Sequence, residues 1–598
     1  MKKTNFNFIR INCATPYIIK GDLNANLATI KTLIQQAEKD GTAILVLPPL
    51  VLTGYDCGDI FTQELILSTQ EEFLNSLISF TSEMEILIVF SHQTIYKSNL
   101  VEMLSFIKNG NLVAGIPTRR TELNNEVFFI DNEDKYLTIF DTHTDITLGF
   151  SDDHDIQFIL SSSKTLIGKY DYYKKYISSL SAKNKNIIVF CDTNGTKIIA
   201  ENGVILEESS PFGNMESISC DVDLQIIKHE RSVAKVDRRE LTFNKYFAIP
   251  KLRISDDKML KRLVPKSPFM PLDSEKYNQC LEIFAIQTQE IASRLISSHA
   301  KKSVIGISGG LDSTLALLAT AVAHKKIGLS TEDIITITMP GFGTTDRTYE
   351  NALTMMESLG TTSLEIPIKK AVLSHFEDIS HDPKIKDSTY ENSQARERTQ
   401  ILMDLSNKYG GIVIGTGDLS EIALGWCTYN GDHMSMFGAN AGIPKTVIKE
   451  VIRWFIDEFL QNDNFIKDYK TLAHSLKDVV DTPISPELLP TNNDGQLEQK
   501  TEDTVGPYEL VDFFLYYHIR YGFRPSKIQY LADLAFEGEY DHNFIKKYLI
   551  VFYKRFFTQQ FKRTTAPEGV QVGSVDLSSK TWKMPSDVSM QMWLNDIY

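Results

Sequence analysis

The stretch that most constrains this chain runs from Val304 to Thr314, with the sequence VIGISGGLDST, and an apolar run follows at once. Its β-branched start, glycine pair and Ala/Leu-rich continuation predict a short strand, a tight loop and a helix. Two adjacent glycines let the backbone approach a ligand closely, and the loop N–H groups meet the positive end of the helix dipole. Ser308 and Ser313 add hydroxyls, so the loop suits a polyphosphate.

The loop is not of the Walker type, because no lysine follows its second glycine. Instead it contains Asp312, and a carboxylate beside phosphates makes sense if it holds Mg²⁺. The string SGGLDS resembles the pyrophosphate-binding loop of the ATP pyrophosphatase superfamily, whose members split ATP into AMP and pyrophosphate. The alternative is a strand-to-helix turn in which the glycines only relieve strain. The loop residues expected to bind ATP are Gly306, Ile307, Ser308, Gly309, Gly310, Leu311, Asp312 and Ser313.

The length of 598 residues favours two large domains. The net charge of −15 disfavours nucleic acid as a partner. Six scattered cysteines form no C-x-x-C pair, which indicates free thiols in a reducing cytoplasm. The sequence has neither an apolar signal segment nor a run of about 18 apolar residues. We therefore expect a cytoplasmic protein that does not enter a membrane.

The first half alternates short strand patterns with helical ones. Strands are expected at residues 6–13, 43–47, 86–90 and 112–116, and a helix at 22–39. This alternation predicts stacked layers of sheet and helix. Residues 47–61, LPPLVLTGYDCGDIF, are similar to the PEL-x-LTGY-x-x-GDLF segment of the nitrilase-type glutaminase domain in long-form NAD synthetases. The resemblance implies an α/β fold of nitrilase-like αββα sandwich type.

That glutaminase family hydrolyses glutamine with a glutamate, a lysine and a cysteine, in which the carboxylate activates the thiol. At the corresponding positions this chain has Pro49, Thr118 and Ser151. Proline accepts no proton, and a serine hydroxyl is a weak nucleophile when no base is present. We therefore predict a nitrilase-like fold without glutaminase activity. A new hydrolase site made of Ser151, Asp152 and His154 is the alternative, but residues so close on one loop seldom converge in that way.

Three prolines between residues 260 and 273 make this segment the best linker candidate. We place the boundary near Pro265, which gives domains of residues 1–265 and 266–598. Strands are then expected at residues 334–339, 363–368 and 412–414, with helices at 277–295, 347–359 and 394–408. Regular β-α alternation predicts a doubly wound parallel sheet, in which ligands bind at the carboxyl ends of the strands.

Polar segments follow two of these strands, PGFGTTD at 340–346 and GTGDLSE at 415–421. The second could be only a capped helix start, with Asp418 as the N-cap and Glu421 as its capping-box partner. However, the surrounding strings closely resemble the synthetase domain of glutamine-dependent NAD synthetases. These strings are TYENSQARER (389–398), ALGWCTYNGD (423–432), DTPISPELLP (481–490), QKTEDTVGPYEL (499–510), QFKR (560–563) and WKMPSD (582–587).

The resemblance covers residues 270–598 and implies a sheet of the adenine nucleotide α-hydrolase or ATP pyrophosphatase type. It also implies an amidation in two steps. The nicotinate carboxylate of nicotinic acid adenine dinucleotide attacks the α-phosphorus of ATP, and ammonia then displaces AMP. By the family pattern, Asp312 and Glu421 act in catalysis and hold the metal, and Thr416 contacts ATP.

The same pattern identifies residues for the dinucleotide, namely Asn392, Glu421, Trp426, Cys427, Thr428, Tyr429 and Lys562. Trp426 and Tyr429 are expected to stack on the nicotinate ring, and Lys562 to pair with a phosphate or the carboxylate. Ordinary packing or solvation is the alternative for each of them. Asp432 and Lys445 are expected near the pocket.

We expect an NAD synthetase that uses free ammonia, ATP and Mg²⁺, whose first half is a scaffold or an interface in a homo-oligomer. One alternative is ammonia from a separate glutaminase partner that docks on the first half. Another is a regulatory protein that binds nucleotide without turnover, which the intact loop and downstream strings disfavour. The residues leave open whether the acceptor is the dinucleotide or a related mononucleotide.

Overall fold

The chain divides into two compact units, which are residues 1–263 (unit 1) and 264–598 (unit 2). The computed structural model describes residues 6–96, 98–123, 126–130, 137–141, 146–149, 154–162, 164–213, 217–234, 245–249, 252–255, 260–270, 275–462, 469–482 and 501–597. Each unit has hydrophobic cores of its own. The predicted boundary near Pro265 lies beside the division between the units.

Unit 1 is a sandwich of two layers of strands with helices on its outer faces. The strands are β1 (Phe8–Ala14), β2 (Ile44–Val46), β3 (Leu87–Tyr96), β4 (Asn99–Lys108), β5 (Asn111–Leu123), β6 (Glu126–Ile130), β7 (Leu137–Asp141), β8 (Ile146–Gly149), β9 (Ile156–Ser162), β10 (Ile187–Asp192), β11 (Lys197–Glu201), β12 (Val204–Glu208), β13 (Ser217–Asp223) and β14 (Lys245–Ile249). The helices are α1 (Leu23–Lys39), α2 (Glu64–Phe80), α3 (Lys169–Asn184) and α4 (Leu224–Val233).

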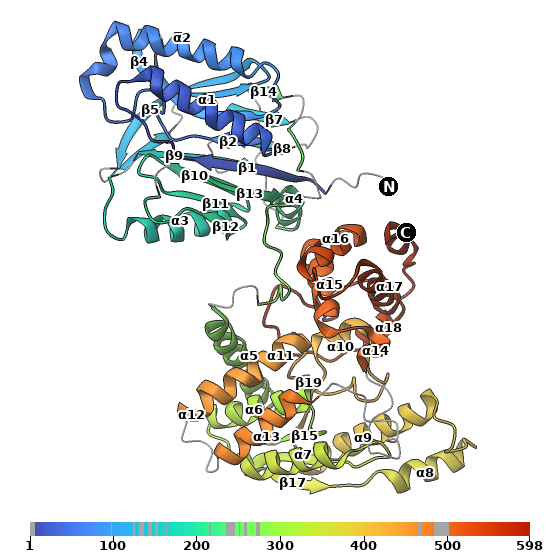
Figure 1. The fold of residues 1–598 in the computed structure, drawn as a ribbon. Helices are drawn as coiled ribbons and strands as arrows, with labels where there is room; N and C mark the ends of the chain where they lie inside the picture. Colours follow the sequence, from blue (N-terminus) through green and yellow to red (C-terminus); the bar gives the residue numbers. More distant parts are fainter. Residues whose placement is uncertain are drawn as a thin grey trace. The chain divides into compact units, whose positions relative to one another are not determined.

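One hydrogen-bonded path joins the main strands in the order β12-β11-β10-β9-β6-β5-β4-β3-β2-β1-β13. Its two halves face each other, because Val89 of β3 and Val189 of β10 belong to the same buried apolar cluster. Helices α1 and α2 cover the outer face of one half, where Ile34 packs in a cluster with Phe90. Helix α3 covers the other half (Figure 1), where Tyr173 packs in a cluster with Phe190. The predicted αββα sandwich is confirmed.

Local sequence explains where these elements begin and end. Helix α1 begins at Leu23 because the Asp22 carboxylate caps it, accepting a hydrogen bond of 3.1 Å from the Ala25 N–H. Strand β3 extends beyond the predicted 86–90, since the antiparallel partner β4 pairs with it residue by residue as far as Tyr96. Apolar periodicity predicted the buried start of β3, and cross-strand pairing determines its more polar continuation.

Unit 2 is built on a parallel sheet, and a layer of helices follows the last strand toward the C-terminus of the chain. The strands are β15 (Ser303–Gly306), β16 (Ile334–Thr338), β17 (Thr362–Glu365), β18 (Ile412–Gly415) and β19 (Phe437–Gly438). The helices are α5 (Lys276–Ser298), α6 (Leu311–Lys326), α7 (Asp346–Ser358), α8 (Lys369–Asp378), α9 (Ser388–Tyr409), α10 (Leu419–Leu424), α11 (Lys445–Trp454), α12 (Leu460–Asn462), α13 (Tyr469–Asp481), α14 (Thr501–Val505), α15 (Tyr508–Tyr521), α16 (Pro525–Ala535), α17 (His542–Thr558), α18 (Gln560–Thr564) and α19 (Gln591–Ile597).

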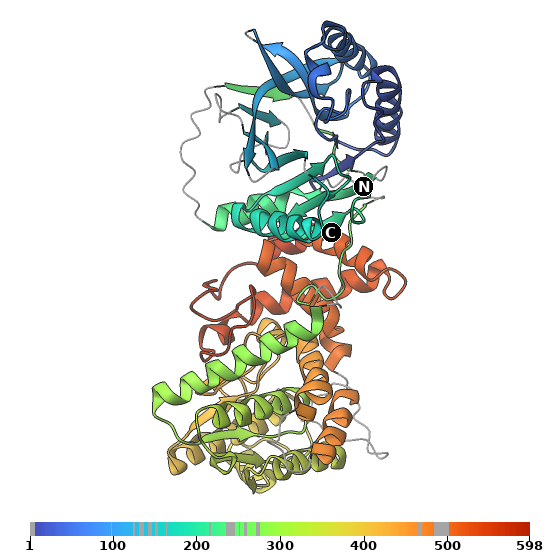
Figure 2. The ribbon, with the colours of Figure 1, turned by 90° about the vertical axis from the view of Figure 1, so that its left-hand side faces the viewer.

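The sheet has the order β17-β16-β15-β18-β19, and every pair in it is parallel. Alternate residues of β15 face opposite sides: Ile305 packs with helices α5, α6 and α11, whereas Val304 packs with α8 and α9. The ribbon of Figure 2 shows the helices of this unit from a second side. The predicted doubly wound sheet is therefore confirmed. Among the described residues, no helix is long and apolar enough to cross a bilayer. All six cysteines are free thiols, as their spacing indicated.

Helices α15 to α19 form an aromatic layer in which His518 is buried. Its ring lies 5.0 Å from that of Phe556 and 5.2 Å from that of Tyr553, measured between centroids. Its Nδ1 lies 3.4 Å from the Tyr553 hydroxyl. Burial, together with the charge of Arg563, lowers the pKa of His518 to about 4.

This histidine predicts a specific acid sensitivity. The unfolded chain binds a proton at His518 near pH 6.5 and the folded chain only near pH 4, so its stability contribution is lost as pH falls between these values. Between pH 7 and pH 4, we expect His518→Phe to gain about 3 kcal/mol of unfolding free energy relative to wild type. Tryptophan fluorescence during denaturant unfolding measures this difference in unit 2 alone, because all four tryptophans lie there. Parallel pH profiles for the two proteins would contradict the prediction.

Candidate functional site

The loop between β15 and α6 brings backbone close to a neighbouring helix. Gly309 has a φ of +83°, and a Cβ at this position would lie 2.0 Å from the Thr348 carbonyl oxygen of α7. Gly310 is the N-cap of α6 and makes no side-chain capping bond. Ser308 and Ser313 lie on the loop with their Oγ atoms 3.2 Å apart. The first turn of α6 therefore presents N–H groups and the positive dipole end to an anion.

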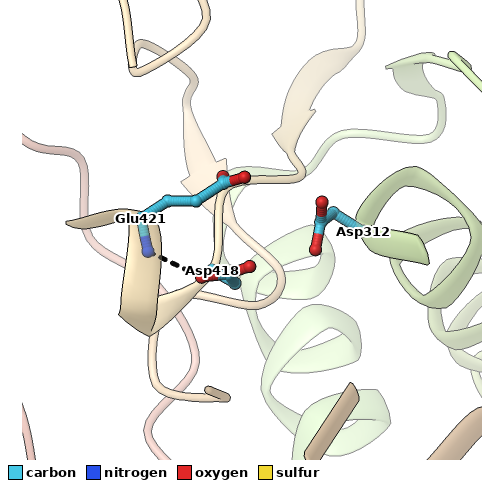
Figure 3. Close-up of side chains that lie close together, drawn as sticks. All are labelled: Asp312, Asp418 and Glu421. Carbon is cyan, nitrogen blue, oxygen red and sulfur yellow. Dashed lines mark hydrogen bonds between the residues drawn. The ribbon is translucent and has the colours of Figure 1, made fainter. Parts of the chain in front are cut away.

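Three carboxylates converge beside this loop, from Asp312 on α6 and from Asp418 and Glu421 at the start of α10 (Figure 3). Their ligand oxygens all lie within 4.8 Å of one another. Asp418 caps α10, since its Oδ1 accepts a hydrogen bond of 2.8 Å from the Glu421 N–H. The carboxylate of Glu421 does not complete a capping box but points at a lysine. The N-cap interpretation of Asp418 is thus correct. The same side chain is also one of the three converging carboxylates.

The lysine is Lys445, the first residue of α11, and it lies among the three carboxylates. Its Nζ is 2.6 Å from Asp312 Oδ2, 2.6 Å from Asp418 Oδ2 and 3.0 Å from Glu421 Oε1. Burial lowers the pKa of Lys445, but the three carboxylates outweigh burial and raise it well above its ordinary value. Burial, opposed by Lys445 and assisted by Asp312, raises the pKa of Glu421 to about 7.

The three carboxylates of Asp312, Asp418 and Glu421 have the chemistry of a site for a hard divalent cation. Three carboxylates and one ammonium leave two negative charges uncompensated when all are ionised. The buried Oδ1 of Asp312 has no hydrogen-bond partner within the described part of the chain. Carboxylate oxygens are the ligands that Mg²⁺ prefers. The residues therefore fit Mg²⁺, with Asp312, Asp418 and Glu421 as the ligands available.

A cavity opens next to Glu421. Six of the polar and titratable residues that line it are Thr416, Glu421, Cys427, Asp432, His433 and Lys562. Burial raises the pKa of Cys427 to about 12, so its thiol is neutral in the cavity wall. Burial also raises the pKa of Asp432 above its ordinary value. Through Glu421 the cavity borders the three carboxylates, and its wall combines these polar residues with apolar ones such as Ile422 and Pro567.

The residues predicted to bind the dinucleotide are held together mainly by their own contacts. Lys562 Nζ donates to the carbonyl oxygens of Gly425 at 2.7 Å and Cys427 at 2.6 Å. The Thr428 hydroxyl donates to Asn392 Oδ1 at 2.8 Å.

The two aromatic residues of this set behave differently. The Trp426 ring lies 4.7 Å from the Arg555 guanidinium, and Tyr429 stacks on His433 with centroids 5.1 Å apart. Tyr429 is 41% exposed, and its ring also lies 5.3 Å from that of Phe561. Within the described residues, Glu421, Cys427 and Lys562 line the cavity, whereas Asn392, Trp426, Thr428 and Tyr429 lie outside its lining.

Two polar contributors were missed at the sequence level. Asn440 Nδ2 donates to the carbonyl oxygens of Asp312 and Thr416, each at 2.9 Å, and so ties the two strand-end loops together. Gln287 of α5 orients it through a hydrogen bond of 2.8 Å to Asn440 Oδ1. No motif or periodicity marks a residue that contacts main-chain carbonyls from a distant loop.

Unit 1 was predicted to lack a glutaminase triad, and the structure describes only part of those positions. Pro49 is buried in the turn after β2. Thr118 lies on β5, paired with Glu102 of β4. The Glu102 carboxylate accepts a hydrogen bond from Ser91, whose Oγ also accepts one of 2.9 Å from the Leu50 N–H. Ser151 lies outside the described residues.

Comparison with known proteins gives matches to both halves. The NAD synthase family matches residues 283–522, and the carbon-nitrogen hydrolase family matches residues 11–142. The glutamine-dependent NAD(+) synthetase of Mycobacterium leprae is 32% identical over 99% of this chain and 98% of its own length. That of Thermotoga maritima is 25% identical over 96% of this chain and 98% of its own. A solved glutamine-dependent NAD(+) synthetase from Cytophaga hutchinsonii matches with a TM-score of 0.44 and 17% identity, covering 99% of this chain and 100% of that one.

The close approach of Gly309 to α7 predicts a strong effect of a single methyl group. Gly309→Ala places an L-residue in the left-handed region and a Cβ against the Thr348 carbonyl. We expect unit 2 to lose at least about 2 kcal/mol of unfolding free energy, measured by tryptophan fluorescence. Gly328→Ala is the matched control, with a φ of +76° and no atom within 4 Å of the added Cβ. Equal losses in the two variants would show that the Thr348 contact has no role.

The position of Lys445 predicts a second effect. Lys445→Met leaves the buried Asp418 and the half-buried Asp312 and Glu421 without their shared cation, which costs about 3–5 kcal/mol of stability. Because a divalent cation can replace part of that charge, millimolar Mg²⁺ should raise the unfolding midpoint of the variant more than that of wild type. Lys266→Met removes an exposed ion pair with Glu539 and should cost no more than about 1 kcal/mol. A small loss that does not respond to Mg²⁺ would contradict the prediction.

Proposed function

Because the chain belongs to the family of glutamine-dependent NAD(+) synthetases, we propose that it amidates nicotinic acid adenine dinucleotide with ammonia. It is an NAD synthetase, a ligase that forms a carbon–nitrogen bond. The observation that carries the proposal is the group of Asp312, Asp418, Glu421 and Lys445 beside the uncapped start of α6. This group combines an anion-binding helix end with carboxylates suited to Mg²⁺.

ATP would bind with its phosphates on residues 306–313 and against the α6 N-terminus. Mg²⁺ held by Asp312 and Glu421, with Asp418 beside them, would neutralise phosphate charge. Lys445 would keep these carboxylates together and add positive charge near the reacting phosphorus. Thr416, on the wall of the neighbouring cavity, would contact the nucleotide.

The dinucleotide would enter the cavity beside Glu421. A nicotinate oxygen forms a bond to the α-phosphorus of ATP, and the bond to pyrophosphate breaks. Ammonia then forms a bond to the carboxyl carbon, AMP leaves with the electron pair of the C–O bond, and the nitrogen loses a proton. Lys562 and Tyr429 would orient the substrate, the first through its charge and the second through its partly exposed ring.

We propose ammonia rather than glutamine as the nitrogen source because the residues that should release ammonia are replaced. Pro49 offers no proton acceptor where the glutaminase domain has its base, and Thr118 has no charge where that domain has its lysine. Ser151 replaces the thiol. Glu102 is the carboxylate paired in register with Thr118, and it accepts a hydrogen bond from Ser91.

The nitrogen source can be tested directly. With ATP, Mg²⁺ and nicotinic acid adenine dinucleotide, the purified protein should form NAD from ammonium chloride and none from glutamine, measured by chromatography. Glutamine should first be treated with an ammonia-scavenging enzyme, since traces of ammonia would mimic glutaminase activity. Glu421→Gln should lower the ammonium-dependent rate by about 100-fold, because it removes charge from the metal site.

Other results would change the proposal in definite ways. Glutamine-dependent turnover by the purified chain would contradict the loss of glutaminase activity, and Glu102→Gln would then test whether that carboxylate acts as the base. Glutamine use that appears only after a second protein is added would favour an external glutaminase. Nucleotide binding without turnover from either source would favour a regulatory role.

A further inference from the structure

Helix α15 presents a buried carboxylate to the back of the candidate site. Asp512 is 2% exposed and does not line the cavity or touch the three carboxylates within the described residues. It belongs to the C-terminal helical layer, whereas the site lies at the strand ends of the parallel sheet. A buried carboxylate contributes poorly to stability unless its oxygens are all hydrogen-bonded. Its partners therefore indicate what it does.

Both oxygens of Asp512 accept hydrogen bonds from the two elements that carry the site. Oδ1 accepts one from the Ser420 hydroxyl of α10. Oδ2 accepts two from Thr446 of α11, from the N–H at 3.0 Å and from the hydroxyl at 2.7 Å. Ser420 precedes Glu421, and Thr446 follows Lys445. Asp512 thus holds the immediate neighbours of two residues whose side chains meet 3.0 Å apart.

The same bonds complete the start of α11. Its N-cap is Pro444, whose side chain has no capping atom. The Lys445 N–H instead donates to the Ser420 Oγ at 2.9 Å, and the Thr446 N–H donates to Asp512. Ser420 of α10 and Asp512 of α15 therefore accept the hydrogen bonds that an N-cap side chain of α11 would otherwise accept. If this cap is lost, the first turn of α11 is free to shift, and Lys445 forms part of that turn.

We propose that Asp512 is a positioning residue for the amidation, which holds the start of α11 against α10 so that Lys445 stays among Asp312, Asp418 and Glu421. The inference rests on the proposed function for its consequence in catalysis. The claim that Asp512 fixes the position of Lys445 at the cation site does not depend on which reaction takes place there. Asp512 touches no reacting group and acts through Ser420 and Thr446.

The test uses the full chain with Asp512→Asn and the single-bond variants Ser420→Ala, Thr446→Val and Thr446→Ser. Asparagine keeps the shape but places an NH₂ donor where one carboxylate oxygen accepted. The control is Asp533→Asn on α16, which accepts a hydrogen bond of 2.9 Å from His542 of α17 in the same helical layer. Unfolding of unit 2 is followed by tryptophan fluorescence in every variant.

Two readouts separate positioning from packing. Mn²⁺ titrated by electron paramagnetic resonance reports the cation site without any turnover, and Asp512→Asn should weaken Mn²⁺ binding by about 10-fold. With ammonium as the nitrogen source, kcat should fall by about 10- to 100-fold, while KM for ATP changes by less than about 3-fold. Thr446→Val should lower Mn²⁺ affinity and kcat more than Thr446→Ser, because serine keeps both hydrogen bonds to Asp512.

The proposal is overturned if Asp512→Asn retains Mn²⁺ affinity, or if Asp533→Asn lowers Mn²⁺ affinity and kcat to the same extent. The second result would show that any loosening of the helical layer disturbs the site. Should wild type bind Mn²⁺ but form no NAD from ammonium, the proposed function fails, and the Mn²⁺ titrations still decide the role of Asp512.

Discussion

The ammonium of Lys445 is the interaction on which the site of unit 2 depends. Three carboxylates with oxygens within 4.8 Å of one another would repel strongly in a buried environment. Lys445 lies within ion-pair distance of all three and makes their approach possible. Since each carboxylate and the lysine come from the start of a helix, three helix ends are fixed relative to one another by one charge. The start of α6, whose N–H groups suit an anion, therefore lies beside a place where charge is already organised.

The sheet and much of the site could be predicted because both depend on local pattern. The alternation of strands and helices predicted the parallel sheet with ligands at its strand ends, and the family resemblance added that Asp312 and Glu421 belong to one site. Gly309 was recognised by the glycine pair, and its φ of +83° explains the need for glycine. Capping rules identified Asp418 correctly, because its hydrogen bond joins it to Glu421, only three residues further along the chain.

What the sequence did not predict comes from contacts between distant segments. Lys445 was expected only near the pocket, since nothing in the start of an amphipathic helix tells where its side chain will point. Asn440 and Asp512 act through main-chain groups or through neighbours of the site, and such roles have no residue-type signature. The sequence likewise did not predict that α15 to α19 form an aromatic layer distinct from the helices that cover the sheet, because their apolar spacing is that of any packed helix. Spatial convergence is not encoded in periodicity.

The two units relate chemistry to folding in opposite ways. In unit 1 the shared core between the sheet halves is apolar, with residues such as Val89 and Val189. The sandwich is thus held by apolar contacts, while Pro49 lies in a turn and Thr118 on a strand of it. In unit 2 the chemical groups are themselves buried and bonded to the helices that carry them. Loss of one of them disturbs both charge balance and helix position, so the fold of unit 2 constrains its site far more tightly than that of unit 1.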